Sequence, residues 1–155
     1  MKRPLKISFI ALLALFIIIQ FIPRGHNEGI ARGGNDISKA TIFPADVNVI
    51  LQGSCYDCHS NHTEYPWYSK IQPVRYILDD HIRNGKKELN FTEFAGYTKR
   101  RQRSRLREIG QSLSEGSMPL SSYILIHRNA ILSQKEKQRL QQWAKTTGDS
   151  LSLKN

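Results

Sequence analysis

The residues best suited to chemistry lie in one short segment, Cys55-Tyr-Asp-Cys-His59. Both cysteines of the chain are in it, three positions apart, and a histidine directly follows the second. Two residues between the thiols match the separation of the vinyl groups of a porphyrin, so thioether bonds from Cys55 and Cys58 could hold a haem ring. His59 could then bind the iron as proximal ligand, its other ring N–H held by a backbone carbonyl such as that of Pro66 or Pro73. The spacing therefore indicates one covalent haem c per chain.

Two other interpretations of the cysteine pair stay open. A redox-active dithiol of the thioredoxin type needs a strand-helix-strand pattern around it, and this chain has a helical pattern instead. A zinc site needs two further ligands at recognisable spacing, and His59 and His62 are the nearest possibilities. The sequence favours haem over both.

Met118 is the best candidate for the second axial ligand, because it is the only methionine besides the initiator. It lies in a Gly-Ser-Met-Pro-Leu loop, where Pro119 disfavours a helical conformation at Met118 and stiffens the loop. A thioether suits haem iron, although a methionine that fills a gap in the core is the commoner role. His81 is the alternative distal ligand; it follows Ile77 and Leu78 at helical spacing, which predicts a core-facing side chain.

The N-terminus predicts export. Lys2, Arg3 and Lys6 precede an apolar run over residues 7–22, as in segments that carry a chain across a membrane. Residues 1–23 are therefore expected to form a single membrane-spanning anchor or a signal peptide. We favour the anchor because the run is longer than a usual signal core. The expected location is the bacterial cytoplasmic (inner) membrane, crossed once, with the domain facing the periplasm or the exterior.

The rest of the chain divides into three parts. Residues 24–36 are rich in Gly and Asn and predict a flexible tether. Residues 37–150 predict one haem-binding domain, since their length suffices for one modest core. Residues 151–155 are a tail.

Apolar residues at three- and four-residue spacing predict an all-α fold, a small cytochrome c-like helical domain around one haem. Prolines and capping side chains mark the helix starts, and glycines mark most of the ends. The segment Tyr123 to Ile126 is the single strand candidate. The expected helices run from Pro44 to Gly53, from Pro73 to Gly85, from Asn90 over a short distance, from about Thr98 to Gly116, and from Ser133 to Gly148.

The charge of the chain points to anionic partners. It has 23 Lys and Arg against 13 Asp and Glu, a formal net charge of +10. Six of the cations, between Lys99 and Arg107, are expected on one helix, as a solvated face or as a docking patch for an acidic redox partner or an anionic membrane surface. No nucleic acid is expected, because an exported domain would not meet it.

Further stretches complete a recognisable pattern: Cys55-Tyr-Asp-Cys-His-Ser-Asn-His-Thr-Glu-Tyr-Pro-Trp-Tyr68, Pro73, Asp80-His81-Ile82, Leu89-Asn-Phe-Thr92 and Ser117-Met-Pro-Leu120 through His127. Over about residues 40–146 the chain resembles the bacterial haem-binding domain family, small c-type cytochromes that are often anchored by one N-terminal helix. The resemblance implies covalent haem c on Cys55, Cys58 and His59, with Met118 in the Met-Pro segment of the family. It names no redox partner.

These observations favour an electron carrier over an enzyme, because a haem with both axial positions filled exchanges electrons without binding a substrate. A haem-based sensor or peroxidase-like protein is the alternative. It would need a displaceable distal ligand and a polar group such as His81 beside the iron. A structural haem module in a larger assembly is a third possibility.

Overall fold

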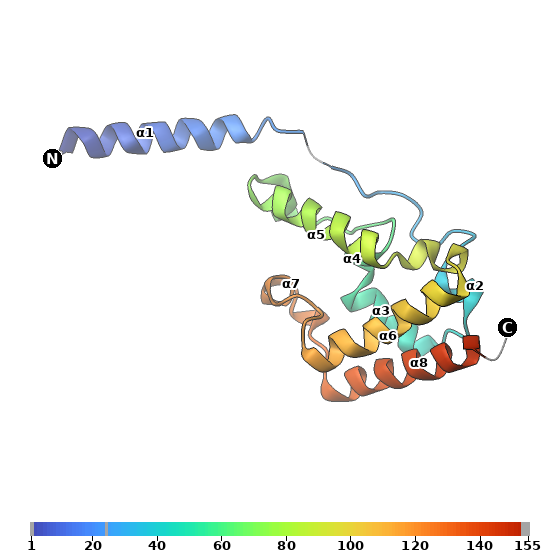
Figure 1. Ribbon diagram of the computed structural model, residues 1–155. Coiled ribbons are helices and arrows are strands. Elements are labelled where there is room, and N and C mark those ends of the chain that lie inside the picture. Colours follow the sequence, from blue (N-terminus) through green and yellow to red (C-terminus); the bar gives the residue numbers. More distant parts are fainter. Residues whose placement is uncertain (1, 24, 153–155) are drawn as a thin grey trace.

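The described part of the chain, residues 2–23 and 25–152 of this computed structural model, is helical and contains no β-strand (Figure 1). The all-α prediction is confirmed. A single bridge between Glu28 and His62 is the β-type pairing seen there. In chain order the elements are α1 (Lys2–Ile19), α2 (Ile37–Ala40), α3 (Ala45–Ser54), α4 (Tyr56–His59), η1 (Trp67–Lys70), α5 (Val74–Glu88), η2 (Phe91–Gly96), α6 (Lys99–Glu115), α7 (Ser121–Ile126), η3 (Arg128–Ala130) and α8 (Gln134–Ser152), where η denotes a 3₁₀ helix.

The predicted membrane-spanning helix at the N-terminus is wrong. Across residues 2–23 and 25–152, no helix combines the length and the apolar character needed to cross a membrane. α1 has 18 residues, and the charged Arg3 and Lys6 lie within it, so its uncharged part is shorter than the ~20 residues that a span requires. α1 extends away from the other helices, and hydrogen bonds between Gln20 at its end and the backbone of Gln72 join it to them (Figure 1).

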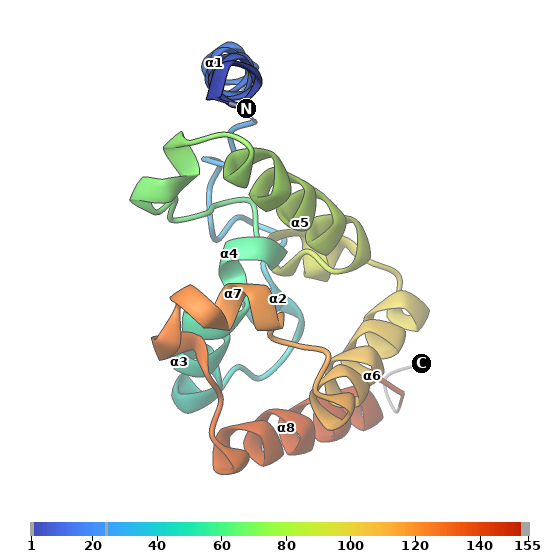
Figure 2. The ribbon, with the colours of Figure 1, turned by 90° about the vertical axis from the view of Figure 1, so that its left-hand side faces the viewer.

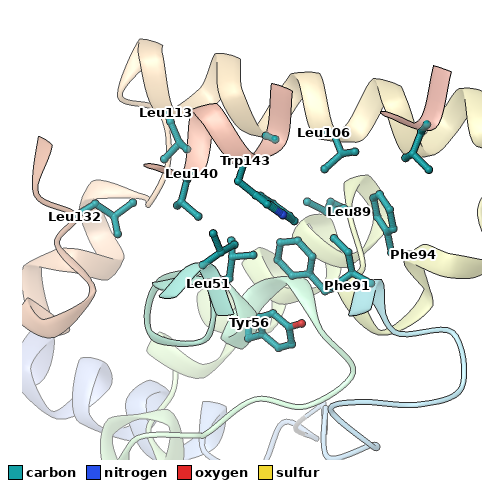
Figure 3. Close-up of a cluster of buried hydrophobic side chains, with 14 residues drawn as sticks. Leu51, Tyr56, Leu89, Phe91, Phe94, Leu106, Leu113, Leu132, Leu140 and Trp143 are labelled. Atoms are coloured by element: carbon teal, nitrogen blue, oxygen red, sulfur yellow. The ribbon is translucent and has the colours of Figure 1, made fainter. Parts of the chain in front are cut away.

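The core lies where α6 and α8 cover α3, α4 and η2 (Figure 3). Leu106 of α6 and Leu140 of α8 are fully buried, and Tyr56 stacks on Phe91 at a centroid distance of 5.0 Å. Burying a large apolar side chain contributes roughly 1.5–3 kcal/mol, so this cluster holds the helices together. Its labelled members in Figure 3 are Leu51, Tyr56, Leu89, Phe91, Phe94, Leu106, Leu113, Leu132, Leu140 and Trp143.

Local capping explains why α6 and α8 begin where the sequence predicts. The side chain of Thr98 accepts a hydrogen bond from the Arg101 amide, which starts α6. At the start of α8, the Ser133 hydroxyl accepts from the Glu136 amide at 3.3 Å, and the Glu136 carboxylate accepts from the Ser133 amide at 2.8 Å. These caps satisfy amides that have no partner within the helix. α6 ends at Glu115, and the residue that caps it, Gly116, has a φ of 68°, which favours glycine.

Three predicted features differ from the structure. α5 continues past Gly85 to Glu88, and α8 continues past Gly148 to Ser152. Gly85 allows close helix packing rather than ending its helix, because a Cβ there would lie 2.7 Å from the carbonyl oxygen of Cys58. The strand candidate Tyr123 to Ile126 is helical, as α7, since a lone strand would leave its backbone groups unpaired.

The segment predicted as a flexible tether packs on the domain. Asn27 is buried, and its side-chain amide donates to the Ser60 carbonyl and to the Thr63 hydroxyl, both at 2.9 Å. The Gly29 amide donates to the Asn61 carbonyl at 2.8 Å. Polar side chains thus attach this segment through hydrogen bonds rather than through apolar burial. Arg24 of the predicted tether and residues 153–155 of the predicted tail lie outside the described residues.

Candidate haem site

The cysteine motif forms one helical turn. α3 ends at Ser54, and the carbonyl of Cys55 accepts hydrogen bonds from the amides of Cys58 at 3.2 Å and His59 at 3.0 Å. Residues three and four positions apart lie on the same face of a helical turn. The two thiols and the imidazole therefore project to one side. α4 directly follows α3 and contacts it, as Figure 2 shows.

A backbone carbonyl fixes the orientation of His59. Its Nδ1–H donates to the Leu89 carbonyl at 2.9 Å, which leaves Nε2 as the nitrogen able to bind a metal. Burial lowers the pKa of His59, although hydrogen bonds to the Leu89 and Gly85 carbonyls act in the opposite direction. The neutral ring is the form that binds iron. The expected acceptors Pro66 and Pro73 are wrong, since Leu89, directly after α5, takes this role.

Two adjoining cavities surround this turn. One has a volume of about 300 Å³ and the other about 290 Å³, at the lower end of the usual range for small-molecule sites. Cys55, His59 and Met118 line both of them, while Cys58 and His81 line the first. The structure thus brings every predicted site residue to one place. The apolar lining of the second cavity consists of Leu51, Leu89, Phe91, Ile109, Leu113, Pro119 and Leu140.

Both candidates for the distal ligand reach the first cavity. Met118 is half-buried in the loop between α6 and α7, and His81 is half-buried on α5, four residues before Gly85. The prediction that His81 faces the apolar core is wrong, because His81 is only half-buried and Ile77, four residues before it, is 52% exposed. His81 lines the cavity instead.

A hydrogen bond that the sequence did not reveal connects the Met118 loop to the cysteine motif. The Tyr123 hydroxyl of α7 donates to the Asp57 carboxylate at 2.8 Å, and Tyr123 lines the first cavity. Burial and the charge of Asp57 raise the pKa of Tyr123, so this hydroxyl stays protonated at neutral pH. On its other side, Tyr123 stacks on His127, whose Nε2 lies 2.5 Å from the Tyr68 hydroxyl. In the sequence, only the four-residue spacing of Tyr123 and His127 indicates that these two rings stack.

The sequence profile of the haem-binding domain family matches residues 14–146. The chain belongs to the haem-binding domain family. The match runs from within α1 into α8 and includes the cysteine motif, His81 and Met118. No curated protein and no solved structure shows significant similarity. The family recognised in the sequence is thereby confirmed, and the cavities belong to a haem-binding protein.

The competing uses of the cysteines suit this haem-binding domain poorly. Burial raises the pKa of Cys55 to about 12, with the negative charge of Cys58 as a smaller cause. Burial also raises the pKa of Cys58 to about 11, assisted by the charge of Asp57. Redox-active dithiols have a lowered pKa, so the dithiol interpretation is disfavoured. Zinc is disfavoured too, because the described residues contain no cluster of three or more His, Cys, Asp or Glu side chains that could hold a metal.

The donors of the site fit haem. Arg105 of α6 lines the second cavity, and its Nη1 bonds to the carboxylates of Glu88, at 3.1 Å, and Glu108. Its Nε atom is buried and has no hydrogen-bond partner among the described residues. A haem propionate is an acceptor of matching chemistry for such a donor. The haem-binding domain thus combines two thiols, an oriented imidazole, apolar walls and an unsatisfied cationic donor.

Proposed function

We propose that this haem-binding domain is a c-type cytochrome that carries one covalent haem and transfers electrons without acting as an enzyme. The observation that supports it best is that Cys55, His59 and Met118 line both cavities, with Cys58 beside them in the first. Such a set would provide two thiols for covalent attachment and two side chains, an imidazole and a thioether, that could bind the iron.

Each of these residues has a distinct role in the proposal. Cys55 and Cys58 would form thioether bonds by addition of their thiols to the haem vinyl groups, and His59 would bind the iron through Nε2, the nitrogen that its hydrogen bond to Leu89 leaves available. Met118 would supply the second iron ligand, and its soft thioether would favour the reduced form. Bound haem would supply an iron that gains and loses one electron. The apolar side chains around it limit the access of water, which also tunes the reduction potential.

One observation favours a second candidate function. His81 lines the same cavity as Met118, and it is a polar group beside the distal side of the proposed site. If Met118 is displaced easily, a small ligand could bind the iron with His81 next to it, as a haem-based sensor or a peroxidase-like protein requires.

The location and the partner are also part of the proposal. We propose that the domain works on the periplasmic or outer side of the cell, because basic residues precede an apolar segment at the N-terminus. Its redox partner is expected to be acidic, since the chain carries a formal charge of +10. Protease treatment of intact cells, compared with lysed cells, tests the location.

Absorption spectra of the oxidised and reduced protein, expressed with a haem-attachment system, test the ligand set. We expect a six-coordinate spectrum with a Met–iron charge-transfer band in the oxidised state and no change on adding carbon monoxide. Ready binding of carbon monoxide would favour the sensor or peroxidase-like function instead.

A further inference from the structure

A second surface of the molecule has the features of a binding site. α6 and α8 lie side by side in both Figure 1 and Figure 2, and a cavity of about 660 Å³ lies along them. We call it the basic groove. Arg100, Arg103 and Arg107 of α6 line it, and Lys145 of α8 adds a fourth cation. The only acidic lining residue among those described is Asp149, which pairs with Lys145 at 2.8 Å.

The shape of the groove follows from its small residues. Leu106 and Ala144 are buried where the two helices meet, and Gly110 and Gly148 carry no side chain that could fill the space above them. A Cβ added at Gly110 would find no atom within 4 Å. The groove is therefore concave, and cationic side chains form its walls.

The arginines of the groove lack the aromatic and acidic partners that Arg101 and Arg105 of the same helix have. Arg100 and Arg107 have no carboxylate within 4 Å in residues 2–23 and 25–152, and Arg103 donates only to the Ser152 hydroxyl, at 3.2 Å. By contrast, Arg101 lies 4.0 Å from the centre of the Tyr97 ring. Arg105 is bonded to two glutamates.

The placement of these arginines on α6 is unfavourable for the stability of the helix. The first turn of α6 contains no acidic residue, and cations near a helix N-terminus interact unfavourably with the helix dipole. Arg100, Arg103 and Arg107 are also three and four residues apart, so their like charges repel one another. The row of arginines is therefore expected to lower the stability of α6, so helix formation does not account for it.

We propose that the basic groove binds an acidic segment of a partner protein. The forked guanidinium groups suit carboxylates, and their helical spacing suits acidic side chains that recur at three and four residues. A concave groove between two helices admits one chain segment, whereas a flat lipid surface cannot enter it. At 100° per residue, the groove arginines lie on the face of α6 nearly opposite Arg105 and Ile109, which line the haem site. The proposal is therefore independent of the haem ligands.

The test uses the full chain and a helical peptide of about 20 residues with glutamates at three- and four-residue spacing. Its affinity is measured by titration at about 50 mM and about 200 mM salt. Replacing Arg100, Arg103 and Arg107 together by Gln should weaken binding at least about tenfold and flatten the salt dependence. Because the row costs stability, the melting temperature of the variant should be unchanged or higher, and its haem spectrum should be unaltered.

The matched control is the triple variant Lys70→Gln, Lys87→Gln and Arg128→Gln, which removes the same charge from exposed positions outside the groove. This control should keep the affinity within about twofold. An equal loss in both variants would show non-specific attraction and overturn the proposal. So would tighter, arginine-dependent binding of anionic lipid vesicles or of a DNA duplex, or a melting temperature that falls in the arginine variant.

Discussion

At the scale of single residues, the site depends on which nitrogen of His59 is available. The spacing of Cys55, Cys58 and His59 is visible in the sequence, and one helical turn is enough to bring them together. The carbonyl that orients the ring could not be predicted, because Leu89 is thirty residues away and reaches His59 only when α5 packs on α4. A local motif thus indicates the chemistry, whereas distant residues set its geometry.

Met118→Ala should change the spectrum and the potential of the loaded protein. Loss of the thioether removes the Met–iron charge-transfer band, opens the iron to carbon monoxide and lowers the reduction potential, since Met ligation favours the reduced form. Spectroscopy and redox titration measure these effects. His81→Ala is the control, because His81 lines the same cavity and should cause none of them. Bis-histidine ligation would give the reverse pattern, with His81→Ala opening the iron.

Tyr123→Phe should loosen the Met118 loop without altering the cavity shape. It removes the hydroxyl that bonds to Asp57 and thereby the link between α7 and the cysteine motif. We expect a weaker Met–iron band, faster binding of carbon monoxide and a free energy of unfolding lower by about 1–2 kcal/mol. Tyr76→Phe is the matched control, since Tyr76 is 64% exposed. Equal spectra for both variants would rule out this role for Tyr123.

At the scale of elements, helix starts could be predicted and some helix ends could not. Thr98 and Ser133 cap their helices through bonds to residues three positions on, so the signal is local. Gly85 does not end its helix, because glycine also occurs where two backbones approach closely, and Cys58 comes to lie against it only when α5 packs on α4. The spacing of His81 from Ile77 predicted a core-facing side chain, but Ile77 itself is exposed and His81 lines a cavity. Helical periodicity cannot distinguish a cavity wall from a core.

Gly85→Ala should separate α5 from the cysteine motif. Its new Cβ would lie 2.7 Å from the carbonyl oxygen and 3.4 Å from the Cβ of Cys58, so α5 or α4 must shift. Such overpacking costs about 1–3 kcal/mol of unfolding free energy, and the shift should also lower the yield of attached haem. Denaturant titration and the haem-to-protein ratio measure both. Gly53→Ala is the control, because a Cβ at Gly53 meets no atom within 4 Å; equal losses in the two variants would contradict the packing argument.

At the scale of the whole molecule, the N-terminal part divides into an outlying helix and a packed segment. The composition of residues 24–36 predicted a tether, because too few apolar side chains are present to form a core. Composition does not show that Asn27 finds partners at Ser60 and Thr63, more than thirty residues later. The haem-binding domain therefore includes a segment whose composition is typical of a linker.

Two variants test this division. Removing residues 1–23 should leave the melting temperature within a few degrees, because hydrogen bonds between Gln20 and Gln72 are the link of α1 to the other helices.

Asn27→Ala should lower the free energy of unfolding by about 1–3 kcal/mol, since it leaves buried partners unsatisfied. Thermal denaturation followed by circular dichroism measures both. A larger loss from the truncation than from Asn27→Ala would show that α1 is part of the folded unit.

The most direct test of the account is whether haem stays on the denatured chain. The protein is expressed with a haem-attachment system, separated on a denaturing gel and stained for haem, and its intact mass is measured. We predict that the wild type keeps one haem through denaturation and that the double variant Cys55→Ser and Cys58→Ser loses it. A wild type that releases its haem on denaturation, or a double variant that retains it, would contradict covalent attachment at this motif.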